Sequence, residues 1–351
     1  MPIFRQTRDE MRGKVQTVTG LIAPEALGPT LLHEHILLDI RIPAWKDLEQ
    51  VGDVITLANR FAIDYCEITA PGNYVLNKSQ VAIDELKEMY EVGGRTVVDV
   101  SCGGLHPKPQ ELNKIALASG VNIVVGCGYY VDEYQSPENQ NRSIDDFTHE
   151  IIDQIQIGAW DTNVKAGIIG EIGCQSPWTN LEQRVMKAAI LAQQHTGAAL
   201  SIHPGRDPDQ PFEVSQMFKC EKADLSRVIM SHVDRTIFDD DRLFALADTG
   251  IVIELDLFGM ESSFYKYNLD VDMPNDAVRL RAIRKLIDRG HLHQIAISQD
   301  ICQQTRLGCN GGHGYGHIYR NVIPMMLRRG FNQSEIDTIL VETPKRLLTF
   351  A

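Results

Sequence analysis

The segment "TLLHEH", residues 30–35, places His33 and His35 on either side of Glu34 within an apolar run. In a β-strand, side chains two positions apart point to the same face, so both imidazoles face one way and Glu34 faces the other. Imidazole nitrogens that converge on one point suit a divalent metal ion. We therefore expect a metal-binding pair in this strand and a structural role for Glu34.

Four further apolar runs carry a polar residue inside them or at their end: Glu171 in "GIIGEIG", His203 in "SIHP", His232 in "MSHV" and Asp300 in "ISQD". An unpaired polar group in such a run would cost about 1–3 kcal/mol. Taken singly, each has another explanation, such as a hydrogen-bonded core histidine, a glutamate paired with an arginine, or an aspartate that caps a helix. Taken together, the nitrogen and oxygen donors suit Zn²⁺, Mn²⁺ or Fe²⁺.

The size of this donor set favours two metal ions over one. Four histidines and two carboxylates exceed what one catalytic zinc uses, and two ions about 3.5–4 Å apart would share a bridging carboxylate. Glu171 is the expected bridge, because its strand lies between the strand of His33 and His35 and the strands of His203 and His232.

The elements that must position these residues are eight apolar, β-rich runs with amphipathic stretches between them. The runs cover residues 30–40, 95–101, 121–131, 165–173, 198–204, 227–233, 250–259 and 294–300. Near-continuous hydrophobicity is typical of parallel strands covered on both faces. Helical patterns follow at 79–93, at 180–197 with Asn180 in the cap position, and at 276–290. Eight such units predict an α/β fold, a (β/α)8 TIM barrel, whose strand ends share one mouth.

The alternative is a doubly wound sheet, but the first strand–helix unit of this sequence has no GxGxxG motif, which such a sheet would use to bind a dinucleotide.

Two long segments follow the ends of predicted strands, where barrel enzymes keep their active-site loops. Residues 41–80 are an expected insertion after the first strand, and residues 132–146 are an expected polar loop after the third. Residues 1–29 should form an N-terminal extension, a hairpin packed on the barrel. Without a repeat or linker, residues 1–351 should form a single domain.

Charge and cysteine content narrow the function classes. The net charge of −13 and the lack of a basic stripe disfavour binding to nucleic acid or to an anionic membrane. The polar start lacks a signal-peptide core, and no apolar run approaches the ~18 residues of a membrane span. Seven cysteines without a CxxC pair fit reduced thiols, so we expect a cytoplasmic protein.

Longer motifs resemble a known family. "GPTLLHEH", "AGIIGEIG", "SHVDRT" and "SQD" are similar to motifs of the phosphotriesterase family in the amidohydrolase superfamily, and "DLFG", "DMPND" and "GGHGYGHIYRNVIPMML" to those of its phosphotriesterase-related branch. Many members bridge their metals with a carboxylated lysine; here Glu171 stands at that position, as in the related branch, and Lys165 lies at the wrong end of its strand. The resemblance implies two divalent ions, zinc first and manganese or iron as alternatives, held by His33, His35, Glu171, His203, His232 and Asp300.

The resemblance also implies an activity. Asp300 would act as the proton shuttle for a metal-bridging hydroxide. Tyr130 would face the metals and contact the hydroxide or the substrate oxygen; its alternative is packing in the core. Members of this branch cleave N-acetyltaurine to taurine and acetate, so the expected substrate is a small anionic N-acyl amine. Its sulfonate requires cationic or donor groups near the mouth. The candidates, each of which could instead form a surface or structural contact, are Arg206, Arg235, Arg306, His313 and Tyr315. A lactonase or phosphotriesterase, a metal-binding protein without turnover, and assembly as a homodimer remain open.

Overall fold

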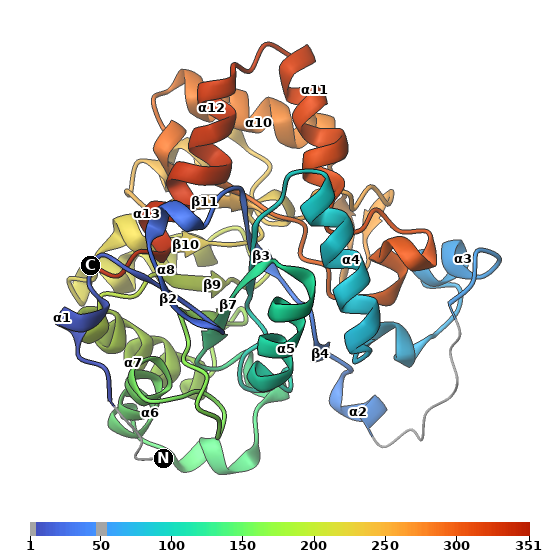
Figure 1. Cartoon of the computed structure of the whole chain (residues 1–351). Helices are drawn as coiled ribbons and strands as arrows, with labels where there is room; N and C mark the ends of the chain where they lie inside the picture. Colours follow the sequence, from blue (N-terminus) through green and yellow to red (C-terminus); the bar gives the residue numbers. More distant parts are fainter. Residues whose placement is uncertain (1–4, 47–54) are drawn as a thin grey trace.

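The computed structural model describes residues 5–46 and 55–351. Its centre is an eight-stranded parallel sheet in the order β14-β11-β10-β9-β8-β7-β6-β3. Figure 1 shows the helices arranged around these strands. All eight expected strands are present, each shorter than its apolar run. They are β3 (Thr30–Glu34), β6 (Thr96–Asp99), β7 (Asn122–Cys127), β8 (Ile168–Gly173), β9 (Leu200–His203), β10 (Val228–Met230), β11 (Val252–Leu255) and β14 (Ile295–Ile297).

The two end strands of this order, β3 and β14, approach each other and nearly close the sheet into a barrel. The amide of Asp300 donates to the carbonyl of His33 (3.1 Å), and the amide of His33 donates to Ser298 Oγ (3.0 Å). The buried carboxylate of Glu34 accepts hydrogen bonds from Ser298 Oγ and from the amides of Gln299 and Ile301, at 2.7–2.9 Å. Glu34 therefore joins the two strands, and the predicted barrel is confirmed.

Helices surround the strands, and a core of buried apolar side chains from Met11 to Phe350 lies mainly between the two layers. Those that follow the strands are α4 (Ser79–Glu91), α5 (Pro109–Ser119), α6 (Ile144–Gln156), α7 (Asn180–Thr196), α8 (Gln210–Cys220), α9 (Asp240–Ala247) and α10 (Asp276–Asp288); α11 (Ile323–Arg328), α12 (Gln333–Asp337) and α13 (Thr343–Leu348) complete the chain. The expected cap of α7 is off by one residue, because Thr179, paired with Glu182, forms the capping box.

The start of the chain packs against the bottom of the barrel, where the strands begin. Helix α1 (Arg8–Met11) precedes an antiparallel hairpin of β1 (Val15–Thr17) and β2 (Gly20–Ile22). Val15 and Leu27 join Leu347 and Leu348 of α13 in one cluster with the inward side chains of the strands. The extension and the last helix therefore seal this end, and the C-terminus lies beside α1 (Figure 1).

The mouth of the barrel is built from the segments that follow the strands. Strand β4 (Leu38–Asp39) directly precedes the insertion at 41–80 and pairs with β5 (Val75–Leu76) inside it. Helices α2 (Pro43–Lys46) and α3 (Arg60–Asp64) lie between the two strands in the sequence, and residues 47–54 lie outside the described part. The loop after β7 ends earlier than expected, because Ser143 caps α6. After β11, a hairpin of β12 (Phe264–Tyr265) and β13 (Asn268–Asp272) forms, which the sequence analysis did not predict. In the described ranges, no helix is long and apolar enough to cross a membrane.

Candidate metal centre

The structure brings the six expected ligands together at the mouth. His33 and Glu171 lie within β3 and β8, His203 ends β9, and His35 follows β3 directly. His232 and Asp300 lie two or more residues beyond the ends of β10 and β14, and both adopt the left-handed conformation (φ 56° and 47°). Non-glycine residues rarely adopt this conformation, and such residues gather at functional sites. The Asp300 side chain is 15% exposed, whereas the others are more deeply buried.

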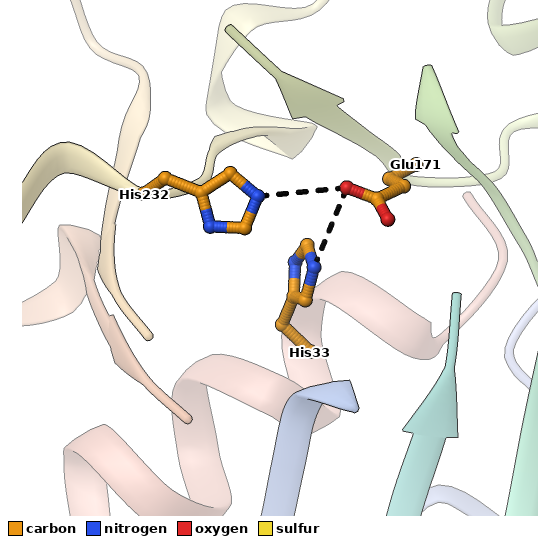
Figure 2. A group of neighbouring side chains, drawn as sticks. All are labelled: His33, Glu171 and His232. Carbon is orange, nitrogen blue, oxygen red and sulfur yellow. Dashed lines mark ion pairs between the residues drawn. The ribbon is translucent and has the colours of Figure 1, made fainter. Parts of the chain in front are cut away.

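Glu171 lies at the centre of the group. Its Oε1 is 3.3 Å from His35 Nε2, and its Oε2 is 2.8 Å from His203 Nδ1 and 3.5 Å from both His33 Nε2 and His232 Nε2. Figure 2 shows His33 and His232 pointing toward this carboxylate from different strands. One oxygen of this carboxylate thus contacts His35, and the other contacts His33, His203 and His232.

The histidine rings are held in defined orientations. Nδ1 of His33 lies 3.1 Å from Ser231 Oγ, Nδ1 of His35 lies 2.9 Å from Ser101 Oγ, and Nδ1 of His232 lies 2.8 Å from Asp256 Oδ1. These contacts leave Nε2 of each ring directed at the cluster. His203 is reversed: its Nδ1 faces Glu171 and its Nε2 lies 3.3 Å from the Tyr130 hydroxyl.

This donor set fits divalent metal ions. Nε2 of His33 is buried and has no hydrogen-bond partner among the described residues, although a buried nitrogen without one is costly. His33 belongs to three groups of three ligand atoms that lie within 4.8 Å of one another. Two of them consist of expected ligands: His33, Glu171 and His232, and His33, His35 and Asp300. The third joins His33 to Glu254 and Asp256, which lie on the Nδ1 side of the ring. Neutral imidazole and carboxylate are ligands that zinc, manganese and iron accept.

Electrostatics keep the carboxylates ionised. Burial raises the pKa of Glu171, but the charges of His33 and His203 and the hydrogen bonds of His203 and His232 outweigh it and hold the pKa well below its usual value. Burial also raises the pKa of Asp300, but the hydrogen bond with His35 and the charge of His232 outweigh it, so this pKa too is lower than its usual value. Both side chains are therefore in the form that binds metal ions.

A cavity of about 820 Å³ opens over the cluster. Tyr130, Arg206 and Arg235 line it, as do Tyr265 and Tyr267 of the β12–β13 hairpin. Arg235 is buried and donates to the carbonyls of Pro204 (2.9 Å) and Gly205 (3.3 Å), so it supports the chain after β9. The guanidinium of Arg206 lies 5.3 and 5.8 Å from the ring centres of Tyr267 and Tyr265.

The other candidates for substrate binding lie outside the lining of this cavity. Arg306 is buried and donates to backbone carbonyls of Phe258, Gln299 and Asp300, and its Nε donates to His313 Nε2 (3.1 Å). The Tyr315 hydroxyl donates to the carbonyl of His35 (2.6 Å). These contacts support the backbone beneath the ligands instead of forming part of the cavity wall.

Sequence reasoning missed several residues that contact the ligands: Ser101, Ser231, Glu254 and Asp256. A signal was available for the two acids, because Glu254 and Asp256 stand two positions apart in the apolar run "GIVIELDLFG", the same spacing as His33 and His35. Serine is common in strands, so the sequence offered no comparable signal for the two serines. The tyrosines of the β12–β13 hairpin were missed because the hairpin itself was not predicted.

Comparison with known proteins agrees with this arrangement. The profile of the Phosphotriesterase family matches residues 13–348. An N-acetyltaurine hydrolase from Salmo salar is 40% identical over 97% of this chain and 99% of its own length, and a phosphotriesterase-related protein from Nematostella vectensis is 40% identical over 96% and 99%. The crystal structure of a resiniferatoxin-binding protein from Rhodobacter sphaeroides superposes with a TM-score of 0.90, at 31% identity and 96% coverage of each chain.

The sequence profile spans nearly the whole chain, and the relatives align with it from end to end. The cluster of histidines and carboxylates provides the metal-binding groups that a hydrolase of this kind requires. The chain belongs to the phosphotriesterase family and is a metal-dependent hydrolase.

Proposed function

We propose that this protein is a binuclear metal-dependent amide hydrolase that cleaves N-acetyltaurine into taurine and acetate. The observation that carries the proposal is the position of Glu171, whose Oε1 contacts His35 and whose Oε2 contacts His203. Such a carboxylate is suited to bridge two ions. The Salmo salar relative, 40% identical over nearly the full length, bears the name N-acetyltaurine hydrolase, which supports this substrate.

In this proposal zinc fills the centre, with manganese or iron as alternatives. His33, His35 and Asp300 would hold one ion and His203 and His232 the other, with Glu171 shared. Bound divalent ions supply a Lewis acid for the amide carbonyl and a water acidic enough to attack it at neutral pH.

The protein's own groups would move the proton. Water adds to the acyl carbon, the C–N bond breaks, and the leaving nitrogen must be protonated because an amine anion is a poor leaving group. Asp300 faces both the ligand cluster and the cavity, so it would take the proton from the attacking water and pass it to the nitrogen. Tyr130, with its hydroxyl beside His203, would orient the acyl oxygen.

Arg206 is the group we assign to the sulfonate. It lines the cavity. Burial lowers the pKa of its guanidinium, but the neighbouring hydroxyl groups of Tyr265, Tyr130 and Tyr267 outweigh this and raise the pKa above its ordinary value. Its guanidinium is therefore available to an anion. A charge-assisted hydrogen bond contributes about 1.5–3 kcal/mol, so Arg206→Ala should raise the KM for N-acetyltaurine about 10- to 100-fold. The exposed Arg281 on α10 provides a matched control, and Arg281→Ala should leave KM unchanged.

The deciding experiment combines metal analysis with a substrate panel. Purified protein should contain about two metal ions per chain and should hydrolyse N-acetyltaurine faster than other N-acetyl amino acids, acyl-lactones or phosphotriesters. One ion per chain would contradict the binuclear centre. A preference for lactones would replace the amide assignment, and metal binding without turnover on the whole panel would mark a binding protein.

The cellular setting completes the proposal. All seven cysteines, each within the described ranges, are free thiols, which fits a reducing compartment. We propose a cytoplasmic protein whose 351 residues form one hydrolase domain, and which assembles as a homodimer. Light scattering on the purified protein tests the dimer directly.

A further inference from the structure

We propose that Ser231 and Glu254 are positioning residues that orient the ring of His33, so that its Nε2 is presented to the metal centre. The inference rests on the proposed metal site, and it adds to that site a buried relay from a carboxylate through a hydroxyl to an imidazole.

The relay lies inside the barrel below the ligands. Ser231 follows β10 directly, and its Oγ lies 3.1 Å from His33 Nδ1, 2.9 Å from Glu254 Oε2 and 3.1 Å from Ser201 Oγ. All four side chains are fully buried, so water cannot replace these contacts.

Hydrogen-bond directions follow from the groups present. A carboxylate only accepts, so Ser231 donates its single hydroxyl proton to Glu254. The lone pairs of Ser231 Oγ then accept from Ser201 and from His33, which places the imidazole proton on Nδ1. Glu254 Oε2 and Asp256 Oδ2 lie 3.5 and 3.6 Å from Nδ1 and favour the proton there as well. A metal ion requires a neutral imidazole, and with the proton on Nδ1 the lone pair of Nε2 would be directed at that ion.

The stability of the fold does not explain why a glutamate is buried at position 254. Its Oε1 is buried without a hydrogen-bond partner in the part of the chain that the structure describes, and this lowers the stability of the fold relative to an apolar side chain. By comparison, the ring of His35 is held by the hydroxyl of Ser101, and the ring of His232 is held directly by the carboxylate of Asp256. Histidines that bind metal ions commonly donate their other ring N–H to a carboxylate or another acceptor, which fixes the ring. Glu254, acting through Ser231, therefore has this role for His33.

The test is the Zn²⁺ affinity of apo-protein, measured by competition with a chromogenic chelator. Ser231→Ala removes the acceptor of Nδ1, and Glu254→Gln removes the charge at constant size; each should weaken binding of at least one ion about 10- to 100-fold. The control is Ser201→Ala, since Ser201 is equally buried and contacts Ser231, and its hydroxyl is not a hydrogen-bond partner of His33 in the described part of the chain. It should retain the wild-type affinity. Because Glu254 acts on His33 chiefly through the Ser231 hydroxyl, the double variant Ser231→Ala/Glu254→Gln should lose less affinity than the two single losses combined.

Two results would overturn the proposal: wild-type Zn²⁺ affinity in Ser231→Ala, or an equal loss in Ser201→Ala, which would indicate packing alone. Thermal unfolding of the apo-proteins shows whether a variant is folded, and Glu254→Gln remains informative if Ser231→Ala is not. The readout does not depend on substrate. Failure of the wild-type protein to cleave N-acetyltaurine would therefore count against the proposed function and not against the relay.

Discussion

At the bottom of the barrel the interior is apolar, whereas the same strands carry polar groups as they approach the mouth. Ala199, Ile229, Val252 and Ala296 belong to the cluster that Val15 and Leu347 seal. Two positions later along these strands stand Ser201, Ser231, Glu254 and Ser298, and two positions later again His203, Asp256 and Asp300. The period of two thus stacks an apolar layer, a layer of hydroxyl and carboxylate groups, and the ligand layer.

The difference shows how one scaffold separates stability from chemistry. The bottom layer buries apolar surface at about 25 cal/mol per Å². The upper layers bury ionisable groups, some of which lack a partner among the described residues, and such groups cost stability. A substitution near the mouth should therefore change activity first, and a substitution at the bottom should change stability first.

The largest expected effect is at the mouth. Asp300→Asn removes the proposed proton shuttle and should lower kcat for N-acetyltaurine about 10³-fold, within the range for loss of general acid–base catalysis. The measurement is the steady-state rate with metal content determined on the same sample. Asp132→Asn, at a carboxylate after β7 outside the cavity lining, is the control and should keep its rate. Full activity in Asp300→Asn would contradict the mechanism.

At the bottom of the barrel, a substitution is expected to lower stability and leave the catalytic rate unchanged. Arg227, at the start of β10, donates to the carbonyls of Arg346, Leu347 and Thr349 at 2.6–2.9 Å and so holds α13 against the barrel. Arg227→Ala should lower the free energy of unfolding by about 3 kcal/mol, since hydrogen bonds to charged groups contribute about 1.5–3 kcal/mol each and are not additive. Chemical denaturation measures the loss, and kcat should not change.

Arg346 offers a matched comparison, because its guanidinium also donates to carbonyls, those of Ser226 and His293, but at the surface. Arg346→Ala should cost about 1 kcal/mol or less. An activity loss in Arg227→Ala, measured well below its unfolding temperature, would show that the two ends of the barrel are coupled.

The same layering explains how much the sequence could predict. The strands were recognisable because parallel strands read as nearly continuous apolar runs, and the ligands because polar residues interrupt those runs at their ends. The pairing of His33 with His35 followed from the period of two. The alternation of side chains along β3 is broken just before this pair, since the consecutive residues Leu32 and His33 both face the interior of the barrel. A register shift between Leu31 and Glu34 makes this possible, and no sequence pattern predicts it.

The loop after β14 shows where prediction ends. Arg306, His313 and Tyr315 follow a ligand-bearing strand, which is why they were candidates for substrate binding. Their placement depends on how the loop folds back: Arg306 donates to carbonyls at the ends of β11 and β14, and Tyr315 to the carbonyl of His35. Loop conformation of this kind depends on tertiary hydrogen bonds and not on periodicity, so cavity residues are harder to assign than metal ligands.

An effect smaller than those of Asp300→Asn and Arg227→Ala, and of opposite sign for stability, is expected at a charge near the mouth. Lys266, in the turn between β12 and β13, lies 4.9 and 5.4 Å from the ring centres of Tyr74 and Tyr267, and burial lowers its pKa from 10.5 to about 8. A lysine whose pKa is lower in the folded state destabilises the fold below that value, where it is charged in both states. Lys266→Met should therefore raise the free energy of unfolding at pH 7 by about 1–2 kcal/mol, less than the full shift implies because two cation–π contacts are lost.

The pH dependence separates this cause from simple apolar burial. The advantage of Lys266→Met should be constant below pH 8, shrink as the pH rises toward 10.5, and vanish above it, because the lysine is then neutral in both states. Denaturation curves at pH 7, 9 and 10.5 measure this, with Lys219→Met at an exposed position of α8 as the control that should change by less than about 0.5 kcal/mol. If Lys266→Met raised the free energy of unfolding equally at all three pH values, the effect would come from packing and not from the lysine charge. The mouth would then differ from the bottom of the barrel in its ligands, but the charge of Lys266 would not lower its stability.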